Sequence, residues 1–242
     1  MKLYEILSED HVDYGNLPES DPVYKRIKNE CKQFIKESEE LPLFRGMNNP
    51  KNKNYIETFD NRIPLSSEKS MVAMFNLYVE ERFGIENVRV KNSVFAVGND
   101  HNARGYGKIH FMFPIDDYKF VWSPVINDLY DNQDWLSASI AGGSKVDYTT
   151  KTARTNFNSD IKHIWPDVTL NNVKNHPDLS VAYKKIKPYI METFDDQKYT
   201  DKDLGAALST GYEIMFQTKA YYVIEMLMGV SYEKHLQRIK EA

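Results

Sequence analysis

The stretch that decides the fold reads Lys108-Ile109-His110-Phe111-Met112-Phe113, then Pro114 to Asp117, then Tyr118-Lys119-Phe120-Val121-Trp122. In the first run, large apolar residues alternate with Lys108, His110 and Met112, as in a strand with one buried face. The second run is equally rich in aromatic and β-branched residues, which favour strands. The short polar break between the runs predicts that they pair as an antiparallel hairpin.

Other apolar runs outside this stretch also predict strands. Leu43 to Met47 is one, and Ser93 to Val97, which ends at the turn pair Gly98-Asn99, is another. Near the C-terminus, Glu213-Ile214-Met215-Phe216 and Ala220 to Glu225 are separated by a short polar turn. We expect these last two runs to form a second strand pair.

Helical spacing of apolar residues appears between these runs. It predicts helices over 21–39, from Ser66 or Ser67 to Gly84, and over 179–194, where Pro188 is expected to kink or split the helix. Thr200 with Asp203 indicates a capped short helix that ends near Gly211. The predicted class is therefore α+β, with residues 20–242 in one domain.

Composition excludes several classes of protein. The 242 residues include 31 Lys+Arg and 35 Asp+Glu, so the net charge of −4 offers no basic face for nonspecific nucleic-acid binding. No apolar window approaches the roughly 18 residues of a transmembrane helix. The lone cysteine, Cys31, excludes an internal disulfide and falls on a predicted buried helix face. The six histidines lack metal-site spacing, and we predict no metal.

Three segments contain residues suited to chemistry. Arg45 lies on an apolar strand directly before Gly46, and a buried arginine is uncommon unless it is paired with an anion. The strand that begins at Ser93 ends in a turn of small residues, where a ligand can approach the backbone. Glu213 opens an apolar strand, and burial of its carboxylate requires a partner. An internal ion pair, or simple exposure at strand ends, also explains Arg45 and Glu213.

The order of these segments resembles the ADP-ribosyltransferase fold of the Arg-Ser-Glu type, in the variety packaged in tailed-bacteriophage virions. In that family an Arg-Gly on the first core strand precedes a Ser-Thr-Ser strand end and a Glu that opens a late strand. Leu43-Phe44-Arg45-Gly46 is similar to the first motif, and the run from Glu213 to Ile224 to the third. The resemblance covers roughly residues 20–125 and 200–225. It implies a split antiparallel sheet core with an N-terminal helix and flanking helices.

The resemblance also implies an activity, mono-ADP-ribosylation with NAD as substrate. Glu213 would be catalytic, because a carboxylate near the ribose stabilises the positive charge that develops at C1′ when nicotinamide leaves. Arg45 would bind the ribose and phosphate side of NAD, and the backbone of Gly46 would approach the nicotinamide amide. Ser93 and Tyr106 are further candidates for NAD binding, Tyr106 by stacking on nicotinamide; an ordinary turn or core tyrosine is an equally good interpretation.

The middle motif departs from the family pattern. The positions of the Ser-Thr-Ser element read Ala96-Val97-Gly98, without a hydroxyl, and Ser93 lies in a different register. Position 211 is Gly rather than the Gln or Glu of arginine- or asparagine-directed transferases. These departures keep open an alternative function, a noncatalytic head-internal or structural protein of the virion that retains the fold.

Two regions bear on partners. Residues 1–19 resemble the capsid-targeting peptides of phage head proteins, and Leu7-Ser8-Glu9 matches the Leu/Ile-x-Glu form of their cleavage site. The plainer interpretation is a short amphipathic segment that packs Leu3, Ile6 and Leu7 on the domain. Residues 137–160 are small and polar and predict a long loop or insertion, in which Lys145 to Arg154 could form a local basic groove. The expected partners are a host protein or nucleic acid as acceptor, and capsid or virion proteins, with no membrane. The implied location is the virion, then the host cytoplasm.

Overall fold

The computed structural model describes residues 22–48, 54–58, 69–129, 131–132, 140, 148–227 and 229–242. In chain order its helices and strands are α1 (Pro22–Glu30), α2 (Lys32–Glu37), β1 (Phe44–Met47), β2 (Tyr55–Glu57), α3 (Lys69–Phe83), β3 (Ser93–Val97), α4 (Asp100–Ala103), η1 (Arg104–Tyr106), β4 (Lys108–Pro114), β5 (Lys119–Trp122), α6 (Tyr148–Asp160), η3 (Ile161–His163), α7 (Leu170–Asn175), α8 (Pro177–Asp196), α9 (Leu204–Thr210), β6 (Glu213–Gln217), β7 (Ala220–Glu225) and α10 (Tyr232–Glu241). The chain is thus of the α+β class, as its sequence predicts.

The described strands form a seven-stranded antiparallel sheet in the order β2-β7-β4-β1-β3-β6-β5. The joint between β1 and β3 is the weakest, because its register has the one residue pair Phe44↔Val97. By contrast, β1 is aligned with β4 over four pairs and β3 with β6 over five. The sheet therefore consists of two well-paired halves, β2-β7-β4-β1 and β3-β6-β5, that meet at a narrow seam.

Both predicted hairpins are wrong, although all four strands exist. β4 pairs with β1 and β7, so both of its edges are occupied, and β5 pairs with β6 in the other half. The connection between β4 and β5 is anchored to the N-terminal helices instead. The backbone of Asp116 donates to the Glu30 carbonyl at 2.7 Å, and its carboxylate accepts from the backbone of Gln33 at 2.7 Å. β6 and β7 likewise enter different halves.

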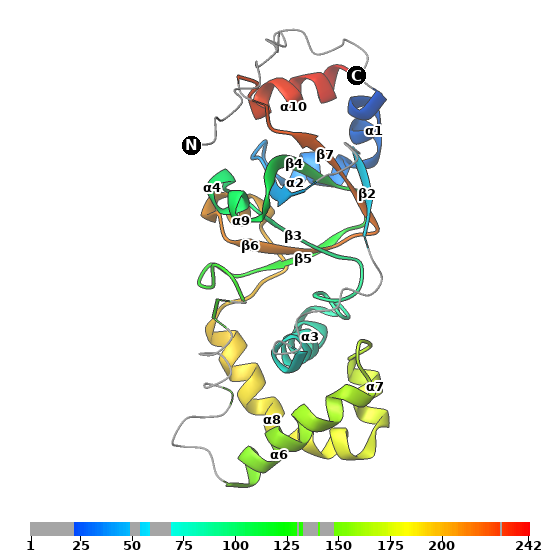
Figure 1. Ribbon diagram of the computed structural model, residues 1–242, viewed down its shortest axis with the longest axis vertical. Helices are drawn as coiled ribbons and strands as arrows, with labels where there is room; N and C mark the ends of the chain where they lie inside the picture. Colours follow the sequence, from blue (N-terminus) through cyan, green and yellow to red (C-terminus); the bar gives the residue numbers. More distant parts are fainter. Residues whose placement is uncertain are drawn as a thin grey trace, which may run out of the picture.

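Helices cover the sheet on two sides. Figure 1 shows α1 and α10 toward one end of the molecule and α3, α6, α7 and α8 toward the other. Strand β3 shows how the alternation of side chains serves both sides: Val94 and Ala96 belong to the core cluster that includes α1, α2 and α10, whereas Phe95 packs against the cluster of α3, α6 and α8. Helix α3 is buried nearly all round, which confirms its predicted core role, and Gly84 ends it at a φ of +65°.

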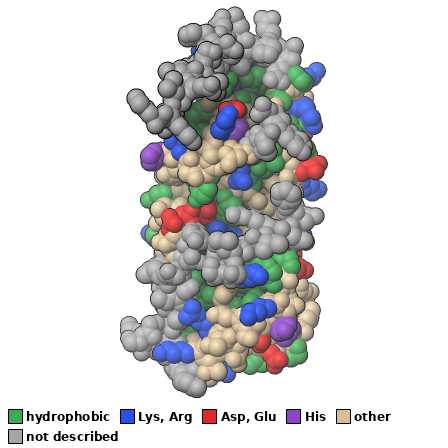
Figure 2. Space-filling model, in the orientation of Figure 1, with side chains coloured by type: hydrophobic (Ala, Val, Ile, Leu, Met, Phe, Trp, Pro, Cys, Tyr) green, Lys and Arg blue, Asp and Glu red, His purple; other side chains and the backbone are tan. Residues whose placement is uncertain are grey.

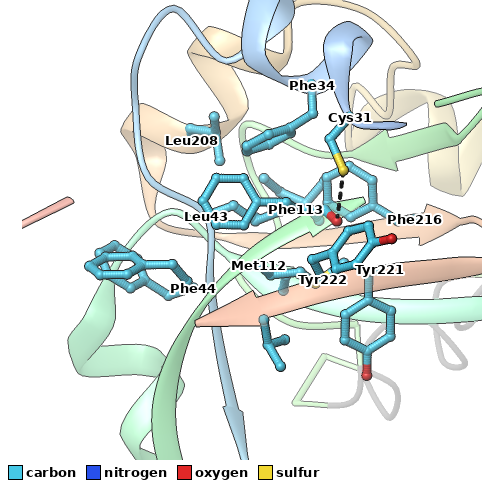
Figure 3. Close-up of a cluster of buried hydrophobic side chains, with 14 of the residues drawn as sticks. Cys31, Phe34, Leu43, Phe44, Met112, Phe113, Leu208, Phe216, Tyr221 and Tyr222 are labelled. Carbon is cyan, nitrogen blue, oxygen red and sulfur yellow. Dashed lines mark hydrogen bonds between the residues drawn. The ribbon is translucent and has the colours of Figure 1, made fainter. Parts of the chain in front are cut away.

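The N-terminal helical segment confirms a core position for Cys31. The predicted helix over 21–39 is interrupted there, between α1 and α2. Cys31 is fully buried among Phe34, Leu43 and Phe113, and its thiol donates to the Phe113 carbonyl at 3.6 Å (Figure 3). Burial raises the pKa of this thiol well above its usual range, so it remains protonated.

The loop predicted over 137–160 is wrong for its second half, which is helical, whereas the helix predicted over 179–194 is present as part of α8. Residues 148–160 form α6, because Ala153, Phe157 and Ile161 recur at a spacing of four and pack in the helical core. Their pattern is diluted in the sequence by threonines and asparagines.

α8 runs unsplit through Pro188, which lies at an exposed position where water can satisfy the carbonyl that lacks its N–H partner. The short helix after Thr200 is capped by Asp203, which accepts from the Ala206 backbone at 3.0 Å.

Several predictions lie outside the described residues. These are the targeting peptide over 1–19 with Leu7-Ser8-Glu9, the capping serines Ser66 and Ser67, and the Gly142–Lys145 part of the insertion. Within the described ranges, no helix combines the length and apolar character needed to cross a membrane.

Candidate functional site

The three segments that the sequence singles out lie on three adjacent strands. Arg45 is on β1, β3 is its neighbour, and Glu213 opens β6 on the other side of β3. The register aligns Phe44 with Val97 and Val97 with Glu213, so the two charged residues fall near the same end of β3. The fold therefore brings together residues that are far apart in the sequence, across the seam between the two halves of the sheet.

Glu213 forms an ion pair with Arg89, a residue that sequence reasoning missed. Arg89 Nη1 donates to Glu213 Oε1 at 2.8 Å, with side-chain exposures of 8% and 13% respectively. The backbone N–H of Glu213 donates to the Asn127 carbonyl at 2.9 Å, which fixes the start of the strand. An internal ion pair was one interpretation of Glu213, and the structure assigns that pair to Arg89 rather than Arg45.

Arg45 is held at the seam by a different set of contacts. Its Nη1 donates to the carbonyl of Phe95 on β3, and its guanidinium lies 5.6 Å from the centre of the Tyr221 ring. Its Nε is buried without a hydrogen-bond partner among the described residues, and no described carboxylate forms a salt bridge with it. A buried donor without a partner suits the oxygen of an anionic ligand. His110 faces Arg45 in the register, and burial, aided by Arg45, lowers its pKa.

Phe95 connects the two charged groups. Its carbonyl accepts from Arg45, and its ring lies 4.6 Å from the guanidinium of Arg89, the partner of Glu213. A cation over an aromatic face is stabilised by the ring's quadrupole, so Phe95 helps to hold Arg89 in place. Phe95 thus contacts both Arg45 and Arg89. It immediately precedes Ala96-Val97-Gly98, the positions at which the resemblance leads us to expect hydroxyl residues.

Gly46 allows the backbone around Ala103 to pack directly against β1. A β-carbon at this position would lie 1.8 Å from the Ala103 carbonyl oxygen and 3.0 Å from the β-carbon of Tyr106. Only glycine allows the α4–η1 segment to approach β1 this closely. That close approach positions Tyr106 beside the site.

Tyr106 is the exposed aromatic residue of the site. Its side chain is 66% exposed, and its hydroxyl donates to Asp128 Oδ2 at 3.3 Å. Partial burial of the hydroxyl raises its pKa, and the charges of Asp128 and Glu213 act in the same direction. Asp128 follows Asn127, whose carbonyl accepts from the Glu213 backbone, so the segment 127–128 contacts both Tyr106 and Glu213. The exposed ring offers a surface on which a flat ligand could stack.

Ser93 lies at the other end of β3. It is aligned with Gln217, at the far end of β6 from Glu213. Its hydroxyl is buried without a hydrogen-bond partner among the described residues. The structure thus brings Arg45, Gly46, Tyr106 and Glu213 to one region and leaves Ser93 outside it.

Arg89 could have been found by the argument that selected Arg45. It lies between Val88 and Val90, both of which are buried, and a lone cation between apolar residues indicates a buried charge with a partner. The segment around it forms turns without helical or strand periodicity, which concealed it. Within the described ranges, no cluster of three or more His, Cys, Asp or Glu side chains could hold a metal ion.

Charges of both signs are interspersed over the described surface in Figure 2, without a continuous basic stripe on the face in view. Arg154 of α6, at the end of the predicted basic groove, is partly buried, and this burial lowers its pKa.

The chain matches no protein-family model, no curated protein and no solved structure in comparisons with each.

Proposed function

We propose that this protein is a mono-ADP-ribosyltransferase that uses NAD to modify a host macromolecule during phage infection. The observation that carries the proposal is the convergence of Arg45 and Glu213 at one end of β3, flanked by the exposed ring of Tyr106. These two charges in apolar runs are far apart in the sequence, and they lie on the two strands that flank β3, in the chain order of the resemblance.

The proposed chemistry assigns the main step to Glu213. When the bond between nicotinamide N1 and ribose C1′ breaks, its electron pair leaves with nicotinamide, and positive charge develops at C1′. The Glu213 carboxylate, 13% exposed and sheltered from water, stabilises that charge more effectively than it would in bulk solvent. The nucleophilic atom of the acceptor then bonds to C1′ and releases its proton.

Binding of NAD is assigned to Arg45 and Tyr106. The Arg45 guanidinium, whose Nε has no hydrogen-bond partner among the described residues, is proposed to donate a charge-assisted hydrogen bond to a phosphate or ribose oxygen. The exposed Tyr106 ring provides a stacking surface for nicotinamide; its hydroxyl binds Asp128, and the adjacent Asn127 accepts from the backbone of Glu213. Delivery with the virion, by way of residues 1–19, is part of the same proposal.

A second candidate function is a noncatalytic virion protein with the same fold. Two observations favour it: the strand end at Ala96-Val97-Gly98 has no hydroxyl, and Glu213 already has a structural partner in Arg89. A carboxylate that is kept for an internal ion pair needs no substrate to explain its burial.

The experiment that separates the two incubates the protein with NAD labelled on the adenylate and with host lysate. We expect the wild type to transfer label and Glu213→Gln, which keeps the shape of the side chain, to lose the transfer. Glu57→Gln on the exposed edge strand β2 serves as the matched control and should retain it. Protease and nuclease digestion of the labelled product distinguishes a protein acceptor from a nucleic-acid acceptor.

Label transfer that persists in Glu213→Gln would contradict the role of Glu213. No transfer by the wild type, with any of several host lysates, would favour the noncatalytic virion protein.

A further inference from the structure

Arg89 is itself held in place by a chain of buried polar contacts. Its backbone N–H donates to Asn76 Oδ1 at 3.1 Å, and Asn76 Nδ2 donates to Asn87 Oδ1 at 3.4 Å. Asn87 Nδ2 then donates to Asp167 Oδ1 at 3.0 Å. Asn76 is fully buried within α3, so this chain joins the helical layer to the residue that binds Glu213.

The guanidinium of Arg89 is constrained as well as its backbone. Besides Glu213, its Nη1 contacts the sulfur of Met215 at 3.3 Å, and the Phe95 ring lies beneath it. Met215 is two residues from Glu213 on the same strand, so both lie on one face of β6. An arginine fixed by its backbone, a ring and a sulfur has few rotamers left to it and defines the direction of the carboxylate it binds.

We propose that Arg89 is a positioning residue, which keeps the Glu213 carboxylate ionised and oriented for the transfer reaction. This inference rests on the proposed function. An acid that stabilises developing positive charge must be unprotonated and correctly aimed, and burial by itself favours the neutral carboxyl group. The positive charge of Arg89 favours the ionised carboxylate of Glu213 and so opposes the effect of burial. Arg45 binds NAD in the proposed arrangement. The two arginines therefore have separable tasks.

Because Arg89 orients Glu213 and Arg45 binds NAD, substitution of Arg89 should change kcat rather than KM. The variants Arg89→Met and Arg89→Lys test this. Misplacement of a catalytic group by about 1 Å can reduce the rate by about 100-fold. We expect Arg89→Met to lower kcat by roughly that factor and to leave KM for NAD within about threefold. Arg89→Lys retains the positive charge and should recover part of the lost kcat. The matched control is Arg82→Met, which removes an exposed arginine paired with Asp195 and should leave both constants unchanged.

A spectroscopic measurement tests the same inference without any turnover. With 13C-carboxyl-labelled glutamate, the Glu213 resonance is assigned by its absence in Glu213→Gln. We expect it to titrate at a higher pH in Arg89→Met than in the wild type, and near-UV circular dichroism verifies that the variant is folded. If Arg89→Met does not fold, Arg89→Lys and Asn76→Asp, which retains the acceptor for the Arg89 N–H, provide the comparison.

The outcomes separate the inference from the proposed function. An inactive wild type in which Arg89→Met still moves the Glu213 titration would overturn the proposed function and the catalytic task of Arg89, but would support the electrostatic coupling. An active wild type in which kcat is unchanged in Arg89→Met would overturn the inference alone. A rise in KM with unchanged kcat would also overturn it, since it would make Arg89 a substrate-binding residue.

Discussion

Gly46 and Ala103 are packed so closely that a β-carbon at position 46 would lie 1.8 Å from the Ala103 carbonyl oxygen. This contact fixes α4 and η1 against β1, and with them the exposed ring of Tyr106. The position of the Tyr106 ring therefore depends on the absence of a side chain at Gly46.

Gly46→Ala should displace the α4–η1 segment. We expect the free energy of unfolding to fall by about 2 kcal/mol or more, since overpacking forces backbone movement. The proposed transferase activity should fall as well, because Tyr106 moves with the segment. Denaturant unfolding and the labelled-NAD assay measure the two effects.

The control for this change is Gly105→Ala, where a β-carbon would meet no atom within 4 Å. Gly105→Ala should be close to neutral in both measurements. Equal effects of the two substitutions would show that loss of glycine flexibility, rather than the contact with Ala103, is responsible.

Arg45→Gln should weaken NAD binding. A hydrogen bond that involves a charged group contributes about 1.5–3 kcal/mol, so KM for NAD should rise by roughly 10- to 100-fold. Isothermal titration calorimetry with NAD checks this independently of turnover. Arg26→Gln, which removes an exposed arginine of α1, is the control. An unchanged affinity in Arg45→Gln would remove Arg45 from the proposed NAD site.

The Arg89–Glu213 pair should be strongly coupled in stability. Removal of one member of a buried pair leaves an uncompensated charge and costs about 3–5 kcal/mol, so Arg89→Met should be much less stable than the wild type. The double variant Arg89→Met with Glu213→Gln should recover part of that loss. A double-mutant cycle from urea unfolding gives the coupling, and strictly additive effects would contradict a direct interaction.

Acid should destabilise the contact between α1 and α10. His235 is fully buried, Tyr24 Oη lies 2.8 Å from its Nδ1, and burial lowers its pKa to about 4. In the unfolded chain the pKa is about 6.5, so the unfolded state takes up the proton first as the pH falls. This contribution to stability is complete above pH ~6.5 and is lost toward pH ~4, by roughly 3 kcal/mol.

The comparison of His235→Gln with the wild type checks the acid effect. Urea unfolding between pH ~7.5 and ~4.5 should show a smaller pH dependence in the variant. His101→Gln, at an exposed position, should retain the wild-type dependence. Parallel curves for the wild type and His235→Gln would assign the acid sensitivity to other groups, of which buried His110 is one.

Local pattern was sufficient for most of the strands and for the core. Alternation identified β4, apolar runs identified β3 and β6, and the spacing of Cys31 and Phe34 identified a buried helix face. Each of these patterns depends on neighbours within a few residues. Strand pairing was not accessible in this way. The four-residue connection after Pro114 reads as a hairpin, but pairing with β1 and β7 buries both edges of β4 and overrides the local signal.

In the candidate site, too, the sequence revealed the residues with a local signal and missed those set by tertiary contacts. Arg45 and Glu213 were visible as charges in apolar runs, and the family resemblance placed them together. The partner of Glu213 was not recognised from the sequence, because Arg89 lies in a turn segment without periodicity. The displacement of Ser93 from the site follows from a register that only the paired strands reveal. α6 was missed because three apolar residues among many polar ones give a weak helical signal.

The interleaving of the strands has a consequence for biosynthesis. β6 lies between β3 and β5, and β7 lies between β2 and β4, so each half of the sheet receives an interior strand from the last part of the described chain. The half β3-β6-β5 cannot be completed before Gln217 has been synthesised, and the half β2-β7-β4-β1 cannot be completed before Glu225. Until these strands are synthesised, β3 and β5 lack their native partner β6, and β4 lacks β7. Unpaired strand edges of this kind favour association between chains.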